Sequence, residues 1–486
     1  MTNGNEPPGD AGGGDAGDAG DADGTRPPRR EGGATWRLLR HVVDIAPGEV
    51  RAVLIAALYF FFTLSSYFIL RPIRDAMAVA AGVSSLPWMF AGTLVTMLIA
   101  IPIYSSLVVR FRVKRFIGIT YQFFAANLVL FFLATHLGAN EVWLGRIFFV
   151  WTSVFNLFVV TVFWSFMADS FRSGQAKRLF GFIGVGGTIG SITGSGITAL
   201  LAKSLGPVNL LLVSAALLEL AVALVVAFPN ERVAEAVEPR AVAEVETEER
   251  ERRPIGGSAW AGITQVARSP YLLGIAGFLV LYVLGSTVLY FEQTDIIGRY
   301  FVGRGARTEI LARMEFAAQL LAALTQAFLT GRVIRWIGLT ATLAIMPAIS
   351  MVGFAAIGAS AWGLTPLLAT FVVFSVARRS SNFALTNPAM ETLYTVVSRE
   401  DKYKAKSFIE TFVYRAGDQI GAWGYAGLAA LGLGLTAIAW VAVPLSAAFL
   451  AVGVWLGRRQ RAIAHHEEAR ERALTREAAA RVAASA

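Results

Sequence analysis

The chain carries twelve long apolar stretches, and this feature limits its fold more than any other. Their centres lie near residues 60, 97, 127, 155, 191, 218, 281, 321, 347, 380, 418 and 445. A helix that crosses the hydrocarbon core needs about 20 mostly apolar residues, and each stretch meets that length. No segment alternates polar and apolar residues in units of about ten, which argues against a membrane barrel. The pattern predicts an all-helical membrane protein with twelve transmembrane helices.

The composition excludes several classes of function. Hydrophobic residues make up 55% of the chain and charged residues only 16%, whereas soluble domains carry about 25% charged residues. The absence of cysteine excludes disulfides and thiolate chemistry. The four histidines all lie outside the apolar stretches, so a histidine metal centre is not expected. We therefore expect neither enzyme activity nor a cofactor or metal ion.

The distribution of basic residues predicts the orientation. If the N-terminus is cytoplasmic, the cytoplasmic segments hold 32 Lys and Arg residues and the outer segments hold six. This bias predicts that both termini are cytoplasmic and that the number of spans is even. It also accounts for the net charge of +9 without a nucleic-acid-binding surface. The first 34 residues lack the apolar core of a signal peptide, so we expect a multi-pass protein of a bacterial inner membrane.

The polar segments divide the chain into five parts. They are a disordered cytoplasmic tail (1–45), a first six-helix half (46–228), a charged cytoplasmic linker (229–270), a second six-helix half (271–457) and a cytoplasmic helical tail (458–486).

A short repeat relates the two halves. Residues 112–120 read RVKRFIGIT and residues 332–340 read RVIRWIGLT, each after the second span of its half. Two six-helix halves of the same orientation around a central loop are typical of the major facilitator fold, in which substrate binds between the halves at mid-membrane. We therefore predict this fold, and a monomer embedded in the lipid bilayer.

Three motifs resemble the ATP:ADP antiporter (nucleotide transporter) family. Residues 69–75 read ILRPIRD in the first span, residues 163–169 read FWSFMAD in the fourth, and residues 384–391 read ALTNPAME in the tenth. The similarity extends over about residues 45–457. The family belongs to the major facilitator group and exchanges nucleotides, so the resemblance implies an exchanger of the ATP/ADP type.

The resemblance also implies functional residues. The first-span charges of the family match Arg71, Arg74 and Asp75. In the fourth span, Val150 stands where the family has a glutamate before a tryptophan. In the tenth span, Met390 stands where a lysine precedes the glutamate, and Asn382 replaces a further lysine. Each of these changes removes a charged group that could bind a phosphate or its counter-charge.

Polar and charged side chains inside the spans are the candidate substrate-binding residues. A charge at the bilayer centre costs at least ~2.5–3.5 kcal/mol, so it faces a cavity or a partner. Arginine suits an anionic small-molecule substrate because its planar fork donates two parallel hydrogen bonds. The candidates are Arg71, Arg74, Asp75, Arg146, Arg378, Arg379, Asn382, Asn387, Glu391, Glu410, Arg415 and Asp418.

Helical spacing predicts how some of these charges are neutralised. Three pairs lie three or four residues apart: Arg71 with Asp75, Arg415 with Asp418, and Arg313 with Glu309. The neighbours Arg378 and Arg379 point about 100° apart, so only one of them is expected to face the cavity.

The glycine-rich segment 181–196 has two readings. It lacks the preceding strand and the Gly-Lys-Ser/Thr ending of a phosphate-binding loop. Instead, Gly186, Gly190 and Gly194 recur every four residues on one helix face. This spacing predicts that a neighbouring helix packs closely against them and slides there during transport.

These observations favour a secondary transporter that works by alternating access on an anionic solute such as a nucleotide. The alternative is a proton-coupled carrier of another organic solute, in which a buried carboxylate takes up the proton. The carboxylates available for that role are Asp75, Glu391, Glu410 and Asp418. A membrane protein without transport activity is a third hypothesis, which the charges at mid-depth disfavour.

Overall fold

The computed structural model describes residues 45–46, 48–110, 113–171, 173–229, 261–397 and 405–485. All regular structure within these ranges is helical. Nearly all of the N-terminal tail and residues 230–260 of the linker lie outside the described residues.

The first half of the chain forms six long helices. They are α2 (Val50–Ala81), α3 (Leu86–Arg110), α4 (Val113–His136), α5 (Glu141–Ser170), α6 (Ser173–Leu201) and α7 (Asn209–Ala227). A short turn of helix, η1 (Val83–Ser85), joins α2 to α3.

The second half begins with a short helix, α9 (Ala261–Arg268), and continues with six crossings. The first three are α10 (Pro270–Tyr300), α11 (Arg304–Phe328) and α12 (Thr330–Ala359). The fourth consists of α13 (Leu367–Ser381), η3 (Asn382–Thr386) and α14 (Asn387–Leu393). The last two are η5 (Ile409–Val413) with α16 (Tyr414–Ala430), and α17 (Leu435–Ser485). All twelve centres predicted from the sequence lie inside these crossings, which confirms the predicted fold class.

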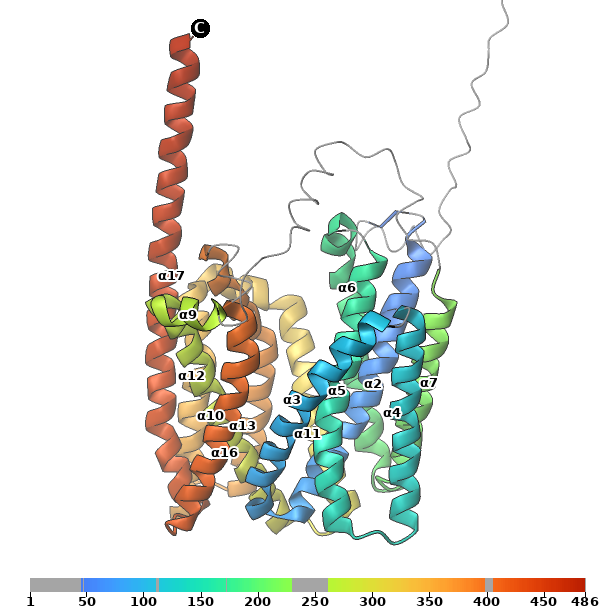
Figure 1. Cartoon of the computed structure of the whole chain (residues 1–486). Coiled ribbons are helices and arrows are strands. Elements are labelled where there is room, and N and C mark those ends of the chain that lie inside the picture. The colour runs from blue at the N-terminus through green and yellow to red at the C-terminus, as the bar shows by residue number, and fades with distance from the viewer. Residues whose placement is uncertain are drawn as a thin grey trace, which may run out of the picture.

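Three crossings of the second half are less apolar than the others. Nine helices of the described chain are long and apolar enough to span a membrane. The crossings α11, α13 and α16 are not among them, yet they run through the bundle beside the rest (Figure 1). They carry Glu315, Arg378, Arg379 and Asp418. Helices α13 and α16 are only 15 and 17 residues long because the turns η3 and η5 interrupt their crossings, and all three crossings carry charges that the bundle has to accommodate.

Among the described residues, the two halves share an apolar cluster at only one end of the bundle. We call the end from which α17 projects the tail end, and the opposite end the far end (Figure 1). At the far end, Met89 and Phe149 of the first half join Phe291 and Phe354 of the second half in one apolar cluster. At the tail end, each half has an apolar cluster of its own. The structure is therefore a conformation in which the halves are closed together at the far end.

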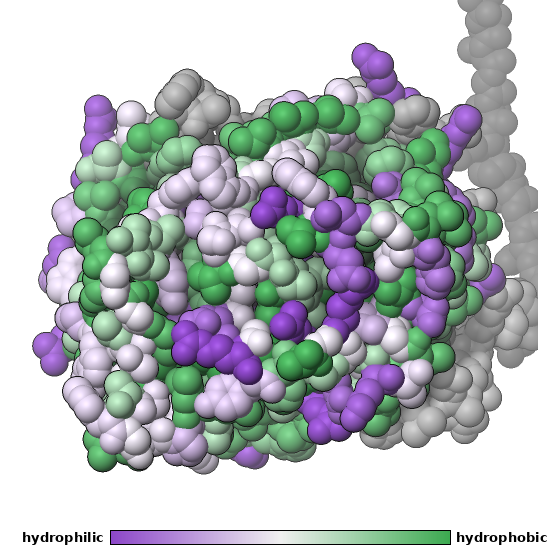
Figure 2. Space-filling model, turned by 90° about the horizontal axis from the view of Figure 1, so that it is seen from below, coloured by the Kyte–Doolittle hydropathy of each residue, from purple (hydrophilic) through white to green (hydrophobic). Residues whose placement is uncertain are grey.

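The face of the far end carries the charges expected where a bundle meets water. Hydrophilic side chains lie among apolar ones over this face (Figure 2). An ion pair between Arg304 and Glu141 links the halves there, and Trp88 of α3 packs edge-on against Trp423 of α16. Polar and aromatic contacts thus reinforce the closure of the far end.

Proline breaks the fourth crossing of the second half. Pro388 has no N–H to donate to the carbonyl of Ala384, which accepts a hydrogen bond of 2.8 Å from Thr330 Oγ1 instead. The adjacent Phe383 carbonyl accepts one of 2.8 Å from Gln326 Nε2. The backbone widens into the π-helical turn η3 at this break. Side chains of α11 and α12 therefore satisfy the carbonyl groups that the proline and the wider turn release.

The glycine face of α6 packs directly on the backbone of α2. A Cβ atom placed on Gly186, Gly190 or Gly194 would lie 2.2–2.3 Å from a carbonyl oxygen of α2. The prediction of close helix packing is confirmed. The partner helix belongs to the same half, so α6 packs against α2 within that half, and the predicted sliding during transport stays a prediction.

This packing predicts the effect of a single methyl group. In Gly190→Ala, the new Cβ meets the Phe61 carbonyl at 2.3 Å, and α2 and α6 have to separate. Overpacking of this kind costs about 1–3 kcal/mol, so we expect a lower melting temperature in detergent, measured by tryptophan fluorescence. The control is Gly184→Ala on the same helix, where a Cβ meets nothing within 4 Å. Equal melting temperatures for the two variants would contradict the packing model.

Candidate functional site

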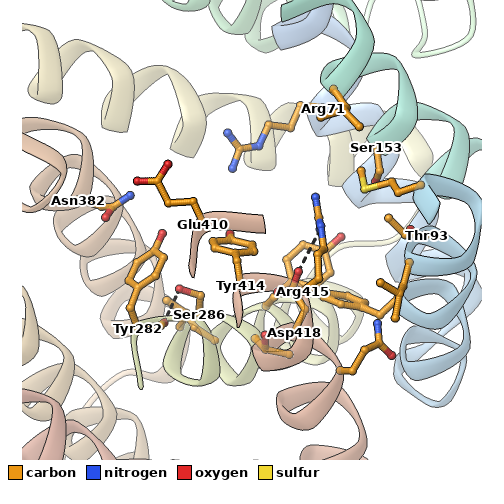
Figure 3. A pocket seen from close by; sticks show the side chains of 18 of the residues that line it. Arg71, Thr93, Ser153, Tyr282, Ser286, Asn382, Glu410, Tyr414, Arg415 and Asp418 are labelled. Atoms are coloured by element: carbon orange, nitrogen blue, oxygen red, sulfur yellow. Dashed lines mark hydrogen bonds and ion pairs between the residues drawn. The ribbon is translucent and has the colours of Figure 1, made fainter. Parts of the chain in front are cut away.

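A cavity of about 620 Å³ lies between the two halves. Helices α2, α3 and α5 line it from the first half, and α10, α12, α13 and α16 from the second. Arg71 and Glu410 point into it from opposite halves (Figure 3). Its volume is in the range typical of small-molecule sites, roughly 300–1,000 Å³. Eight of the twelve predicted site residues line it: Arg71, Arg74, Arg378, Arg379, Asn382, Glu410, Arg415 and Asp418.

Of the other predicted residues, one is buried behind the cavity wall and one lies near the far end. Asp75 is behind the cavity wall, where Arg74 and the Tyr290 hydroxyl both donate to its Oδ1, the latter at 2.9 Å. Arg146 lies near the far end and donates to Ser85 Oγ at 2.9 Å. It is outside the central cavity because α3 lies between them.

The last two predicted residues lie toward the tail end of the second half. Asn387 is exposed at the start of α14. The Glu391 side chain is 59% exposed and pairs with Lys406 at 2.6 Å. Neither lines the central cavity, because α14 follows the π-helical turn η3 and carries them past it.

A buried carboxylate that the sequence analysis missed connects the two halves. Glu315 of α11 has a side chain only 2% exposed. Its Oε1 accepts hydrogen bonds from Arg71 of the first half at 3.1 Å and from Gln319 at 2.9 Å, and its Oε2 pairs with Arg379. The one available signal was a carboxylate inside the eighth apolar stretch, beside the more obvious Arg313.

The predicted local pairs have mixed outcomes. The Arg415–Asp418 pair is confirmed at 3.1 Å, and the Arg313–Glu309 pair is also present. The predicted pair of Arg71 with Asp75 is wrong. Arg74 occupies the Asp75 carboxylate through two of its nitrogens, and Arg71 reaches across to α11.

Arg378 is a buried cation held entirely by neutral groups. The residue is 5% exposed. Each of its three donor nitrogens makes a hydrogen bond of 3.0 Å, to Ser350 Oγ, Ser286 Oγ and the Tyr282 carbonyl. Within the described chain, no carboxylate lies within ion-pair distance of it. Arg379 lines the same cavity, so the expectation that only one of the two arginines faces it is wrong.

The cavity wall carries more positive than negative charge. Five arginines line it: Arg71, Arg74, Arg378, Arg379 and Arg415. Three carboxylates pair with four of them, namely Glu315, Asp75 and Asp418. Glu410 also lines the cavity, but it is 49% exposed and lies 3.8 Å from Lys406. The buried part of the wall therefore has an excess of two positive charges.

Two π-helical turns contribute side chains to the cavity. Asn382 and Phe383 come from η3, and Glu410 and Phe412 come from η5. Such turns interrupt an otherwise regular helix and are frequent at functional sites. In this cavity they lie on neighbouring crossings of the second half.

The two main departures from the nucleotide-transporter motifs lie away from this cavity. Val150 is on the side of α5 that faces Gly92 of α3, at a surface groove. Met390 packs against the apolar cluster at the tail end of the second half. Their apolar character therefore leaves the charges of the central cavity unchanged.

Solved transporter structures share the arrangement of helices described above. A bacterial homologue of the human lysosomal transporter Spinster, inward-facing and unoccupied, is 14% identical, with a TM-score of 0.54 over 86% of this chain and 99% of that chain. An auto-inhibited peptide transporter of the POT family is 16% identical, with a TM-score of 0.54 over 85% and 97%. The inward-open xylose transporter XylE from E. coli is 11% identical, with a TM-score of 0.55 over 83% and 94%. At these identities the likeness concerns the fold.

The family of the chain follows from its sequence as well as its fold. Comparison with curated protein sequences finds no match. The sequence model of the Major Facilitator Superfamily matches residues 52–417, which is most of the chain. That match agrees with the two six-helix halves and the central cavity between them. The protein belongs to the major facilitator superfamily and is a secondary transporter, not an enzyme.

Proposed function

We propose that this transporter carries an anionic organic solute. The proposal depends above all on Arg378, a buried cation at the cavity wall whose hydrogen-bond partners are all neutral. A charge at this depth is costly unless something neutralises it. A carboxylate or phosphate group of the solute would supply that neutralising charge.

A nucleotide is the first candidate for this solute, exchanged for another nucleotide. The motif around Arg71 resembles that of the nucleotide transporters, and Arg71, Arg379 and Arg415 add further cationic groups around Arg378. The rings of Tyr282 and Tyr414 line the same cavity and offer faces on which a base could stack. A volume of about 620 Å³ suits a ligand of that size.

The proposed orientation has the tail end in the cytoplasm of a bacterium. Both termini would then be cytoplasmic, which agrees with the 32 basic residues assigned to that side. Because the halves are closed at the far end, the conformation described here would be the inward-facing one. A monomer would suffice, since the cavity is built from one chain.

Replacing Arg378 tests the anionic solute. In liposomes, we expect uptake of labelled ATP that depends on ADP or ATP inside. Arg378→Gln should weaken it about 10–100-fold, because one or two charge-assisted hydrogen bonds to the solute are lost. Arg313→Gln is the matched control, since that arginine pairs with Glu309 on an exposed surface.

The outcomes separate the solute class from the nucleotide. A second outcome is that the wild type takes up other labelled anions, such as dicarboxylates or sugar phosphates, and loses that uptake in Arg378→Gln. This result would show that the solute is an anion but not a nucleotide. Full transport by Arg378→Gln of every anion that the wild type carries would contradict the proposal.

A proton-coupled carrier of another organic solute is the second candidate, and one contact favours it. Asp75 of the first half accepts a hydrogen bond from Tyr290 of the second half. Rocking of the halves would break this bond and change the surroundings of the carboxylate. In this alternative, Asp75 is the carboxylate that couples the rocking of the halves to the proton gradient.

Replacing Asp75 tests this coupling. If the carboxylate carries the proton, Asp75→Asn should lower the rate of uptake driven by a proton gradient at least about tenfold. The rate of solute exchange without a gradient should stay at the wild-type level. The control is Asp295→Asn, which removes a carboxylate paired with exposed Arg299. Equal losses of both kinds of uptake would assign Asp75 a structural role, and so argue against proton coupling through it.

Glu315 is expected to set the balance between the conformations. In Glu315→Gln, Arg71 and Arg379 lose the carboxylate that joins them across the halves, so the far end should open more often. Each ~1.4 kcal/mol of lost contact energy changes the equilibrium constant between the closed and open far end about tenfold. Because the chain has no cysteine, Met89→Cys in the shared cluster gives a single reactive thiol. Maleimide should label it faster in Glu315→Gln than in the control Glu309→Gln.

A further inference from the structure

A second hollow lies on the outside of the first half. It is a groove of about 1120 Å³ between α3, α4 and α5. Along α3, its lining runs from Trp88 to Leu107, which spans about 28 Å at 1.5 Å per residue. This length is close to the thickness of a hydrocarbon core, roughly 30 Å.

The walls of the groove are apolar and accessible. Large side chains from all three helices line it and are each at least 48% exposed: Trp88, Ile103, Ile119, Phe123, Trp143 and Ile147. In a membrane-spanning bundle, an apolar groove on the outer surface is in contact with lipid. Acyl chains are therefore the natural filling of this space.

One end of the groove is cationic. Arg146 lies where the groove reaches the far end of the bundle, and it donates a hydrogen bond of 2.9 Å to the Ser85 hydroxyl. The Arg146 guanidinium is 4.8 Å from the centre of the Trp143 ring. Within the described chain, no carboxylate lies within ion-pair distance of Arg146. Tryptophan side chains such as Trp88 and Trp143 are typical of the membrane–water boundary, where headgroups lie.

A single helix separates this groove from the central cavity. On α3, Thr93, Met97 and Ile101 face the cavity, whereas Thr96 and Ile103 face the groove. The helix runs obliquely across the bundle and also packs on α16 of the other half (Figure 1). Whatever fills the groove therefore supports a helix that shapes the transport site.

We propose that the groove binds one anionic glycerophospholipid, with its phosphate at Arg146 and an acyl chain along α3. The phosphate neutralises a cation that the protein leaves without a carboxylate, and the acyl chain covers the exposed aromatic and aliphatic wall. Bound lipid stabilises the position of α3 in the conformation closed at the far end. This assignment is independent of the transported solute.

The test measures lipid binding to the purified, delipidated full-length protein. Phosphatidylglycerol should raise the melting temperature more than phosphatidylcholine of the same chain length, and native mass spectrometry should show one retained phosphatidylglycerol. Arg146→Gln should weaken the apparent affinity for phosphatidylglycerol about tenfold or more and abolish the preference between the lipids. Arg299→Gln changes the charge of an exposed, paired arginine at the far end. This variant should leave the affinity for phosphatidylglycerol and the preference between the lipids unchanged.

Two further measurements address the apolar part of the site. Ala100→Trp adds bulk inside the groove and should lower the affinity for both lipids. The preference for phosphatidylglycerol should remain. Glycerol phosphate without acyl chains should cause no comparable shift. The proposal is overturned if both lipids stabilise the wild type equally, if Arg146→Gln binds phosphatidylglycerol as the wild type does, or if glycerol phosphate alone reproduces the shift.

Discussion

The neutralisation of buried charge is the constraint on which this structure depends. Arginines project into a cavity surrounded by apolar helices, and a charge at this depth is costly unless a partner neutralises it. Glu315 supplies one negative charge to arginines from both halves, and Asp75 and Asp418 serve two more. Arg378 has only neutral oxygen partners, and it is the cation that the proposed anionic solute would neutralise.

The contacts inside the first half differ in kind from those between the two halves. Inside the first half, α2 and α6 pack backbone against backbone at three glycines. Between the halves, the contacts are ion pairs, hydrogen bonds and an apolar cluster confined to the far end. Contacts of that kind can be exchanged for others, whereas interlocked backbones cannot. The interface that contains the cavity is therefore where we expect movement during alternating access.

Helix α3 lies between the central cavity and the proposed lipid site. One face carries Thr93 and Met97 into the cavity, and an adjoining face lines the groove in which Arg146 lies. The closure of the far end also involves this helix, since Trp88 packs against Trp423 of the other half. A ligand on either side of α3 thus acts on the same element, which offers a physical route by which membrane composition could influence transport.

The sequence by itself determined the helices, their order and the superfamily. Apolar length fixes a crossing locally, and the Arg415–Asp418 pair follows from spacing within one helix. Only the tertiary structure decided which charges meet across helices. Arg71 pairs with a residue 244 positions away, Arg146 lies behind α3 outside the cavity, and Glu315 becomes the central carboxylate. Helical periodicity relates residues within one helix, whereas these contacts depend on the packing of separate helices.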